Sequence, residues 1–372
     1  MKKYILAICI LGTLCSSCEN NQEKIRNVED WTQYVEPRIG TAHCRWFHFT
    51  PGALPFGLAK PAPSTNGSLG NKWGWEATGY DYRENTIEGF PCLHEFQVGG
   101  IVLMPTSGKL VTVPGLPTDS VKTGYRSHFS RENEIATAGY YSVLLDDYQI
   151  QAELTATPRV AFQRFTFPKG TDNHILFNIG NRQGESGAVK DAYVTYTADG
   201  HIEGWVITMP EYVKKYQPGA TVPLYFSAVL DRKPESYGSF HGNTQLADAK
   251  ESKGTGAGMY FTFSNEQQEA VTAKIGLSYT SVENARINLQ TEAEGKTFED
   301  AKEQAHQIWQ EYLGRIEVET SKREDKVKFY TGLYHALLGR GLANDVNGAY
   351  PRNDGSVGQL PMKEGKPQYN VY

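Results

Sequence analysis

The stretch QIQAELTATPRVAFQRFTF (Gln149–Phe167) shows most clearly how this chain folds. Its first six residues, Gln149–Leu154, alternate polar and apolar side chains, which is the period of a strand with one buried face. A Thr-Pro-Arg break follows, and the run Ala161–Phe167 is rich in the aromatic residues that favour strands. This stretch therefore predicts two strands joined by a turn.

Short strands separated by turns continue on both sides of this stretch, from Gly139 to Ser281. Tyr193–Tyr196 and Ile202–Ile207 flank the turn signal Ala198-Asp199-Gly200, which indicates a hairpin. Further strands are expected at Ile175–Ile179, Leu224–Leu230, Met259–Phe263 and Val271–Leu277. Regular short strands of this kind predict a large antiparallel sandwich of two β-sheets.

The hydrophobic period changes after about Thr280, and the rest of the chain is expected to begin with helices. Thr297 precedes an amphipathic helix with Phe298, Ala301, Ala305, Ile308, Trp309 and Tyr312 on one side. Ser321 and Glu324 have capping-box spacing at the start of the next helix, which is expected to end near Gly339–Gly341. The fold class is therefore mainly β with C-terminal α structure.

The tail after this helix is loop-like and polar. Its most prominent polar residues are Asp345, Asn347, Tyr350 and Asp354. The favoured interpretation is a solvated turn, because Asx residues and glycine dominate turns.

The N-terminus is typical of an export signal. Lys2 and Lys3 precede the apolar run Tyr4–Leu14, which is short for a membrane span. Leu14–Cys18 then resembles a bacterial lipoprotein cleavage box, so residues 1–17 are a lipoprotein signal, Cys18 is lipidated and residues 18–28 form a tether. The alternative is an ordinary secretory signal cut near Ser17. Both alternatives predict export, and lipidation adds an anchor on the periplasmic or cell-surface face of a bacterial membrane.

Composition excludes some partners. The 372 residues carry a formal charge of -5 without a basic stripe, so nucleic acid is not an expected partner. Beyond the signal, only Cys44 and Cys92 remain, and whether they pair is open.

Gly, Pro, Trp, His and Tyr crowd together between Gly40 and Met104. Tight turns that carry aromatic rings beside polar groups suit a sugar, whose ring has apolar C–H faces and a hydroxyl rim. The candidate sugar-contacting residues are Trp73, Trp75, His94, His48 and Glu95. The alternative is that these side chains are core anchors and corners. Glu95 alone is not a catalyst, because glycoside hydrolysis needs two carboxylates.

Several motifs recur in a recognisable order. They are Tyr34-Val35-x-Pro37-x-Ile39-Gly40-Thr41, Pro51-Gly52-Ala53-x-Pro55-Phe56-Gly57, Gly79-Tyr80-x-Tyr82, the stretch Ser278–Leu289, Phe329–His335 and Asp345-x-x-Gly348-x-Tyr350. Together they resemble glycoside hydrolase family 92 from about Glu29 to Tyr372. The chain departs from the family's Ser-His-Thr-His-Leu-Ser-Gly stretch at Pro91–Gln97, where Cys92 replaces one histidine.

The resemblance implies a calcium-dependent, inverting exo-α-mannosidase that acts on α-mannose-containing glycans such as N-glycans. It implies an N-terminal sandwich at residues 29–281, a helical linker at 282–320, and the start of a truncated (α/α)6 catalytic domain at 321–372. The family's general acid, general base and most calcium ligands are expected outside this chain. The alternative function is a non-catalytic, surface-anchored carbohydrate-binding lipoprotein.

Overall fold

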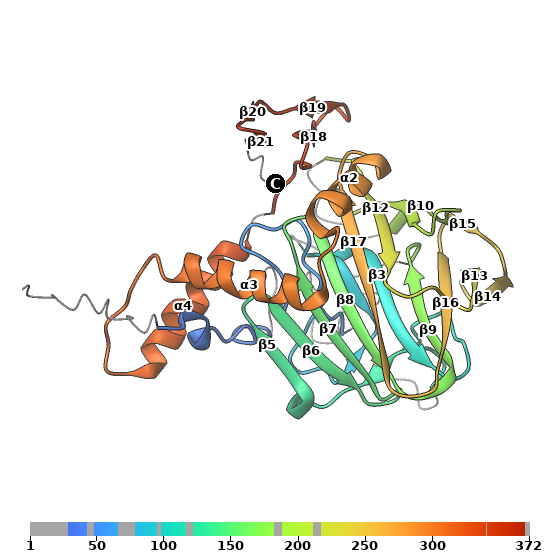
Figure 1. Ribbon diagram of the computed structural model, residues 1–372, viewed down its shortest axis with the longest axis horizontal. Helices are drawn as coiled ribbons and strands as arrows, with labels where there is room; N and C mark the ends of the chain where they lie inside the picture. Colours follow the sequence, from blue (N-terminus) through green and yellow to red (C-terminus); the bar gives the residue numbers. More distant parts are fainter. Residues whose placement is uncertain are drawn as a thin grey trace, which may run out of the picture. The chain divides into compact units, whose positions relative to one another are not determined.

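The computed structural model has two large antiparallel β-sheets, and three α-helices follow them in sequence (Figure 1). The structure describes residues 29–42, 48–65, 79–94, 98–116, 122–181, 188–210, 217–339 and 341–368. The mainly β fold class expected from the strand pattern is confirmed.

The larger sheet contains nine described strands. Their order is β15 (Glu251–Lys253), β10 (Ala188–Tyr196), β11 (Ile202–Met209), β12 (Val222–Leu230), β17 (Glu269–Ser278), β8 (Val160–Phe167), β7 (Ile150–Ala156), β6 (Tyr140–Leu145) and β5 (Glu134–Thr137). The hairpin expected around Asp199 joins β10 to β11, with Tyr196 opposite Ile202. Gly200 adopts φ 87°, the left-handed conformation that such a turn requires.

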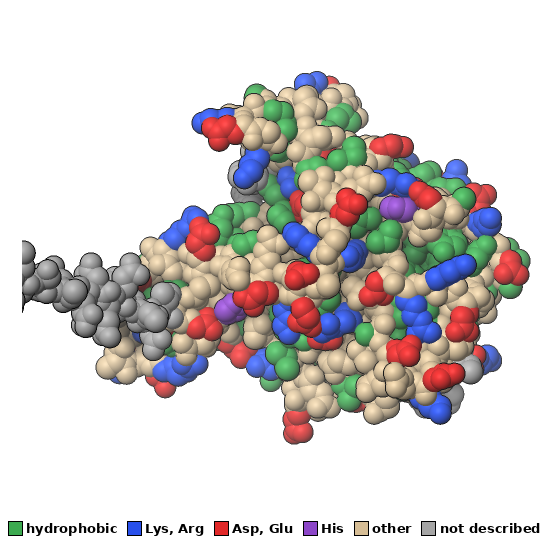
Figure 2. Space-filling model, viewed as in Figure 1, with side chains coloured by type: hydrophobic (Ala, Val, Ile, Leu, Met, Phe, Trp, Pro, Cys, Tyr) green, Lys and Arg blue, Asp and Glu red, His purple; other side chains and the backbone are tan. Residues whose placement is uncertain are grey.

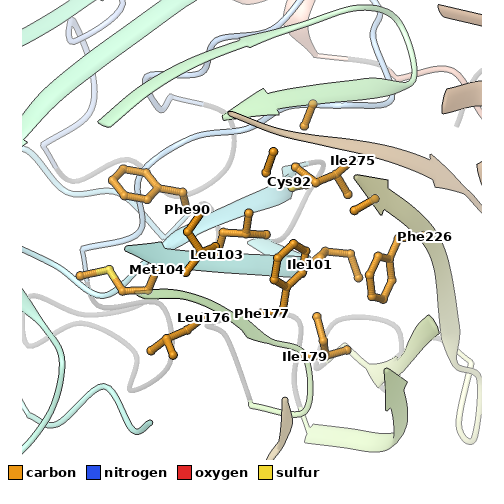
Figure 3. Packing of buried hydrophobic residues seen from close by; sticks show 14 of the residues in the cluster. Phe90, Cys92, Ile101, Leu103, Met104, Leu176, Phe177, Ile179, Phe226 and Ile275 are labelled. Atoms are coloured by element: carbon orange, nitrogen blue, oxygen red, sulfur yellow. The ribbon is translucent and has the colours of Figure 1, made fainter. Parts of the chain in front are cut away.

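The smaller sheet contains six described strands. Their order is β14 (Thr244–Ala247), β13 (Ser236–His241), β16 (Ala257–Asn265), β9 (Gly170–Asn178), β3 (Val98–Ser107) and β2 (Phe90–His94). The main core lies between the two sheets. Figure 3 shows Phe90, Ile101, Leu103 and Phe177 of the smaller sheet among Phe226 and Ile275 of the larger one, all fully buried.

Five helical segments complete the described fold. They are the 3-10 turns η1 (Trp31–Tyr34) and η2 (Arg131–Asn133) and the α-helices α2 (Val282–Ala293), α3 (Phe298–Leu313) and α4 (Arg323–Leu338). Short strand pairs are formed by β1 (Thr86–Ile87) with β4 (Ser127–His128), β18 (Ala349–Pro351) with β19 (Val357–Gln359), and β20 (Met362–Lys363) with β21 (Lys366–Pro367). Among the described helices, none has the length and apolar character needed to cross a bilayer.

Helices α2 and α3 cover the outer face of the larger sheet, whereas α4 packs on η1 and α3. Helix α2 packs on β17 so closely that a Cβ at Gly276 would overlap the carbonyl oxygen of Ala285. Helix α3 crosses β7 and β8 (Figure 1). Its Trp309 side chain lies against Gly139. Figure 2 shows acidic and basic side chains interspersed over this face, in keeping with a formal charge of -5.

The capping box lies at a different helix from the one that the sequence suggested. Helix α4 begins at Arg323 with Lys322 as its N-cap and without a side-chain capping bond, so the capping role predicted for Ser321 is wrong. Ser321 precedes the N-cap position, and the Lys322 side chain has no acceptor atom to offer. The capping box instead starts α3, where Thr297 and Asp300 bond reciprocally.

Thr297→Ala should therefore lower the free energy of unfolding by about 1 kcal/mol, because it leaves the first turn of α3 uncapped. The matched control is Ser321→Ala, which should change stability by less than about 0.5 kcal/mol. Urea unfolding of both variants measures the difference. Equal effects of the two substitutions would contradict this assignment.

Candidate functional site

His48 and His94, the two candidate residues that the structure describes, belong to a loop cluster, which we define as residues 38–41, 48–65 and 79–94. Its segment 60–65 runs beside residues 88–94 and extends the edge of the smaller sheet through backbone bonds: Lys60 N to Cys92 O (2.8 Å), Ala62 N to Pro91 O (3.2 Å) and Ser64 N to Gly89 O (2.9 Å). Gly52 lets the cluster press on β7, because a Cβ there would overlap the backbone of Leu154. The Gly- and Pro-rich loop cluster is therefore an ordered part of the sandwich, held by backbone hydrogen bonds and close packing.

His94 lies inside this cluster, at the end of β2, with only 1% of its surface exposed. Its Nδ1–H donates to the carbonyl oxygen of Lys60 at 2.8 Å, and its ring stacks on Phe49 at a centroid distance of 4.7 Å. Burial lowers the pKa of His94 to about 3, so the ring is neutral. Nε2 is then a lone-pair acceptor, and it has no hydrogen-bond partner among the described residues.

His48 connects the loop cluster to α4. Its ring stacks on His335 with centroids 4.3 Å apart, and its Nδ1 lies 3.3 Å from the carbonyl oxygen of Gly40. Gly40 has φ 85°, and a Cβ there would overlap the His48 ring, so this position requires glycine. Burial, and then the neighbouring His48, lower the pKa of His335 to about 4.

Arg131 and Glu134 hold the cluster segment 79–84 in place. The Glu134 carboxylate is fully buried and accepts hydrogen bonds from Tyr80 OH (2.8 Å), Tyr141 OH (2.8 Å) and Arg131 Nη1 (2.9 Å). Arg131 Nη2 donates to the carbonyl oxygens of Tyr82 (2.5 Å) and Glu84 (2.6 Å). Burial raises the pKa of Tyr80 and Tyr141 well above the usual value, so both phenols stay protonated as donors.

A second buried ion pair lies beside Thr65 and Gly79, the described residues that flank 66–78. Glu88 and Arg126 meet at 2.7 Å with 5% of each side chain exposed. Arg126 also donates to the carbonyl oxygen of Thr65, and Thr65 N donates to Gly79 O at 2.7 Å. Thr65 and Gly79 are therefore held directly against each other.

Three buried carboxylates in and beside the cluster pair with arginine. Asp81 pairs with Arg83 at 2.5 Å, alongside the Glu88–Arg126 and Glu134–Arg131 pairs. A carboxylate whose oxygens bond to an arginine is held in place by that arginine, which suits support of the loops better than proton transfer.

Asp345 is buried, so its predicted place in a solvated turn is wrong. With 2% of its surface exposed, its carboxylate accepts from Ser278 Oγ (3.0 Å), Thr280 Oγ1 (2.5 Å) and Asn288 Nδ2 (2.7 Å). Burial raises the pKa of Asp345 although these bonds oppose the shift. The solvated-turn prediction is confirmed for Asn347 and Asp354, which are exposed. Asp345 instead joins the segment after α4 to the sandwich and to α2.

The remaining sequence candidates cannot be located in the same way. Trp73, Trp75, Glu95, Cys44 and the lipidation candidate Cys18 lie outside the described residues. Cys92 is a buried free thiol whose sulfur accepts a hydrogen bond from the Gln163 amide at 3.2 Å.

Sequence reasoning missed Arg131, Glu134 and His335 as parts of this site. The sequence signal for the first two is their i, i+3 spacing, which also occurs by chance. His335 ends the family motif Phe329–His335, but nothing in the sequence showed that its ring stacks on His48.

A pH prediction follows from the His94 environment. The unfolded chain protonates this imidazole near pH 6.5, whereas the folded chain keeps it neutral until about pH 3. The unfolded state therefore binds more protons than the folded state between these pH values. Because of His94 alone, the free energy of unfolding should fall by about 2 kcal/mol between pH 7 and pH 5. Urea unfolding of the wild type and His94→Gln at both pH values measures it. His94→Gln should show a shallower pH dependence, and an unchanged dependence would contradict the assignment.

Two family models match the chain in succession. The glycosyl hydrolase family 92 N-terminal domain matches residues 34–278, and the glycosyl hydrolase family 92 catalytic domain matches residues 284–372. The first match alone spans more than half of the 372 residues. The family resemblance drawn from the motifs is therefore confirmed.

Individual relatives agree with these matches. An uncharacterized secreted glycosidase from Arthroderma benhamiae is 25% identical over 339 residues, which cover 83% of this chain and 41% of the relative. A family GH92 α-mannosidase from Bacteroides thetaiotaomicron, also solved in complex with mannoimidazole, has a TM-score of 0.81 and 26% identity over 92% of this chain and 45% of its own. An inverting GH92 mannosidase from the same organism shares the fold, with a TM-score of 0.74 and 22% identity over 93% of this chain and 44% of its own.

The chain thus spans less than half the length of these relatives, at 41% to 45%. Within that span, both the domain models and the fold point to one family. The chain belongs to glycosyl hydrolase family 92.

Proposed function

We propose that this chain is the sandwich-bearing part of an exported glycoside hydrolase that acts on α-mannosides, including those of N-glycans. The observation that carries the proposal is the pair of family 92 domain matches, which run from residue 34 to residue 372 with a break only between 278 and 284. The α-mannosidase relative that binds mannoimidazole supports α-mannose as the sugar.

The sandwich would supply sugar contacts from the loop cluster. His94 Nε2 is an acceptor suited to a hydroxyl, although at 1% exposure the residues over it must give way before a sugar can reach it. His48 lies where the cluster meets α4, through its stack on His335. From the sequence we add Trp73, Trp75 and Glu95 to these proposed contacts.

The chemistry would be inverting hydrolysis, as the family resemblance implies. Such a reaction needs an acid and a base about 6.5–9.5 Å apart, with a water between them. Asp81, Glu88 and Glu134 are all paired with arginine, so we assign neither role to them. We propose that residues beyond those described here supply the acid and the base.

Calcium remains a proposal from the family resemblance. Among the described residues, no group of three or more His, Cys, Asp or Glu side chains is arranged to hold a metal ion. Asp345, the buried carboxylate beside the helices, has its oxygens occupied by hydrogen bonds from two hydroxyls and an amide. The described residues therefore do not fit a calcium site, and we route no step through the metal.

Export and anchoring form a separate part of the proposal. The signal at residues 1–17 and the similarity to a secreted glycosidase support export. Cys18→Ala should release the chain from the membrane fraction. Cell fractionation with and without globomycin treatment checks this. If the wild type stays in the same fraction in both, the lipid anchor at Cys18 is wrong, whereas export still stands.

The central experiment tests binding and turnover together. The 372-residue chain, purified with calcium present, is titrated with methyl α-mannoside by ligand-observed NMR and assayed for mannose release from α-linked mannosides. We expect weak binding, with a Kd on the order of millimolar, because one side of a pocket leaves much of the sugar hydrated. We expect no hydrolysis. Absence of any binding would overturn the sugar-contacting role, and turnover that survives purification would overturn the absence of the catalysts.

A further inference from the structure

Tyr82 stands out in the loop cluster because it is exposed where its neighbours are buried. Its exposed fraction is 45%, whereas Tyr80 and Asp81 are fully buried and Glu84 is 5% exposed. An exposed aromatic ring offers a flat apolar face to a ligand, next to a polar hydroxyl.

Arg131 fixes this ring in one orientation. The guanidinium carbon lies 4.5 Å from the centroid of the Tyr82 ring, and Nη2 donates to the Tyr82 carbonyl oxygen at 2.5 Å. The same guanidinium is anchored by the buried Glu134 carboxylate at 2.9 Å. Because Arg131 covers one face of the ring, the exposed surface of Tyr82 belongs to its other face and its edge.

The surroundings of Tyr82 suit a ligand with an apolar face and hydroxyl groups. Tyr82 N donates to Thr41 O at 3.3 Å, which places the ring beside the segment that carries Ile39, itself 46% exposed. The Tyr82 side chain ends in a hydroxyl, which can both donate and accept a hydrogen bond.

We propose that Tyr82, held by Arg131, is a platform on which the C–H face of a pyranose ring stacks. This inference rests on the proposed function and adds a contact that the sequence candidates did not include. A ring already locked by Arg131 loses little conformational entropy when a sugar binds, which favours affinity from a small contact. Tyr82 makes no contact with a reacting bond in this proposal, so it sets affinity and orientation rather than chemistry.

The test separates the ring face from the hydroxyl. The 372-residue chain and its Tyr82→Ala and Tyr82→Phe variants are titrated with methyl α-mannoside by ligand-observed NMR. Tyr82→Ala should weaken binding by about tenfold, because the stacking face is lost. Tyr82→Phe should stay within about twofold of the wild type, because the face remains. Both variants should unfold at nearly the wild-type temperature, since the side chain is largely outside the core.

Leu246→Ala is the matched control, because Leu246 is an exposed apolar residue, at 61%, on β14 and outside the loop cluster. It should bind the sugar as the wild type does. If the wild type binds and Tyr82→Ala binds equally well, the platform is refuted while the proposed function stands. If Tyr82→Phe loses as much affinity as Tyr82→Ala, the hydroxyl rather than the ring face carries the contact and the stacking proposal is wrong. A wild type that binds no mannoside would overturn both proposals.

Discussion

Replacing Glu292 by leucine should lower the free energy of unfolding by about 3–5 kcal/mol, because a buried charge loses its partner. Glu292 lies on α2 and pairs with Arg159 at 2.8 Å, with side-chain exposures of 9% and 7%. Its carboxylate also accepts from Thr157 Oγ1 at 2.7 Å. The substitution leaves the Arg159 guanidinium buried without this carboxylate, with a remaining hydrogen bond to the Asn344 carbonyl oxygen.

A double variant distinguishes the stranded charge from lost packing. Arg159→Met combined with Glu292→Leu removes both charges, and it should recover much of the stability that Glu292→Leu alone loses. The exposed pair of Glu311, on α3, with Arg315, just after its end, is the control, and Glu311→Ala should leave the urea midpoint unchanged. A double variant as unstable as the single one would show that the packing of α2, and not the ion pair, is what matters.

The Arg159–Glu292 ion pair also connects the sandwich to the helical segments. Arg159 precedes β8 of the sandwich, Glu292 belongs to α2, and Asn344 follows α4. Asp345 adds bonds to Ser278 and Asn288 at the same junction. The sandwich and the segment matched by the catalytic-domain model are therefore joined by polar contacts of defined geometry.

The fold was largely predictable because its signals are local. Alternation along Gln149–Leu154 reports one buried face of β7, and the apolar side of Phe298–Leu313 reports where α3 meets the sheet. Both depend only on side chains close in the sequence. The cap of α4 was mispredicted because Ser321 has the right spacing in sequence but falls before the N-cap residue.

The site was less predictable because its geometry comes from distant contacts. Asp345 looks like a turn residue until Ser278 and Asn288, which are 67 and 57 positions away, are seen to surround it. His335 gained significance only from its stack on His48. Burial of a polar group depends on which donors the fold brings to it, and a single sequence does not contain that information.

Trp309→Ala should have a comparably large effect, lowering the free energy of unfolding by about 3–5 kcal/mol. Trp309 is fully buried on α3. Its ring packs at a tilt against Tyr334 of α4, with centroids 4.7 Å apart, and its Nε1 donates to the Ala53 carbonyl oxygen at 2.7 Å. Its ring also fills the space beside Gly139, in the turn between β5 and β6 of the larger sheet. Truncation therefore removes one side chain that ties two helices, the sheet and the loop cluster together, and leaves a cavity that this rigid setting cannot close.

Trp205→Ala is the matched control, because Trp205 is only half-buried on β11 and packs at a tilt against Tyr193 of the neighbouring strand β10, with centroids 4.7 Å apart. It should lose clearly less stability than Trp309→Ala in urea unfolding. Trp309→Phe adds a second comparison, since it keeps most of the ring volume and loses the bond to Ala53. Because Ala53 belongs to the loop cluster, Trp309→Phe should also weaken methyl α-mannoside binding by more than Trp205→Ala does. Equal sugar affinity in these two variants would show that the loop cluster keeps its geometry without the anchor on α3.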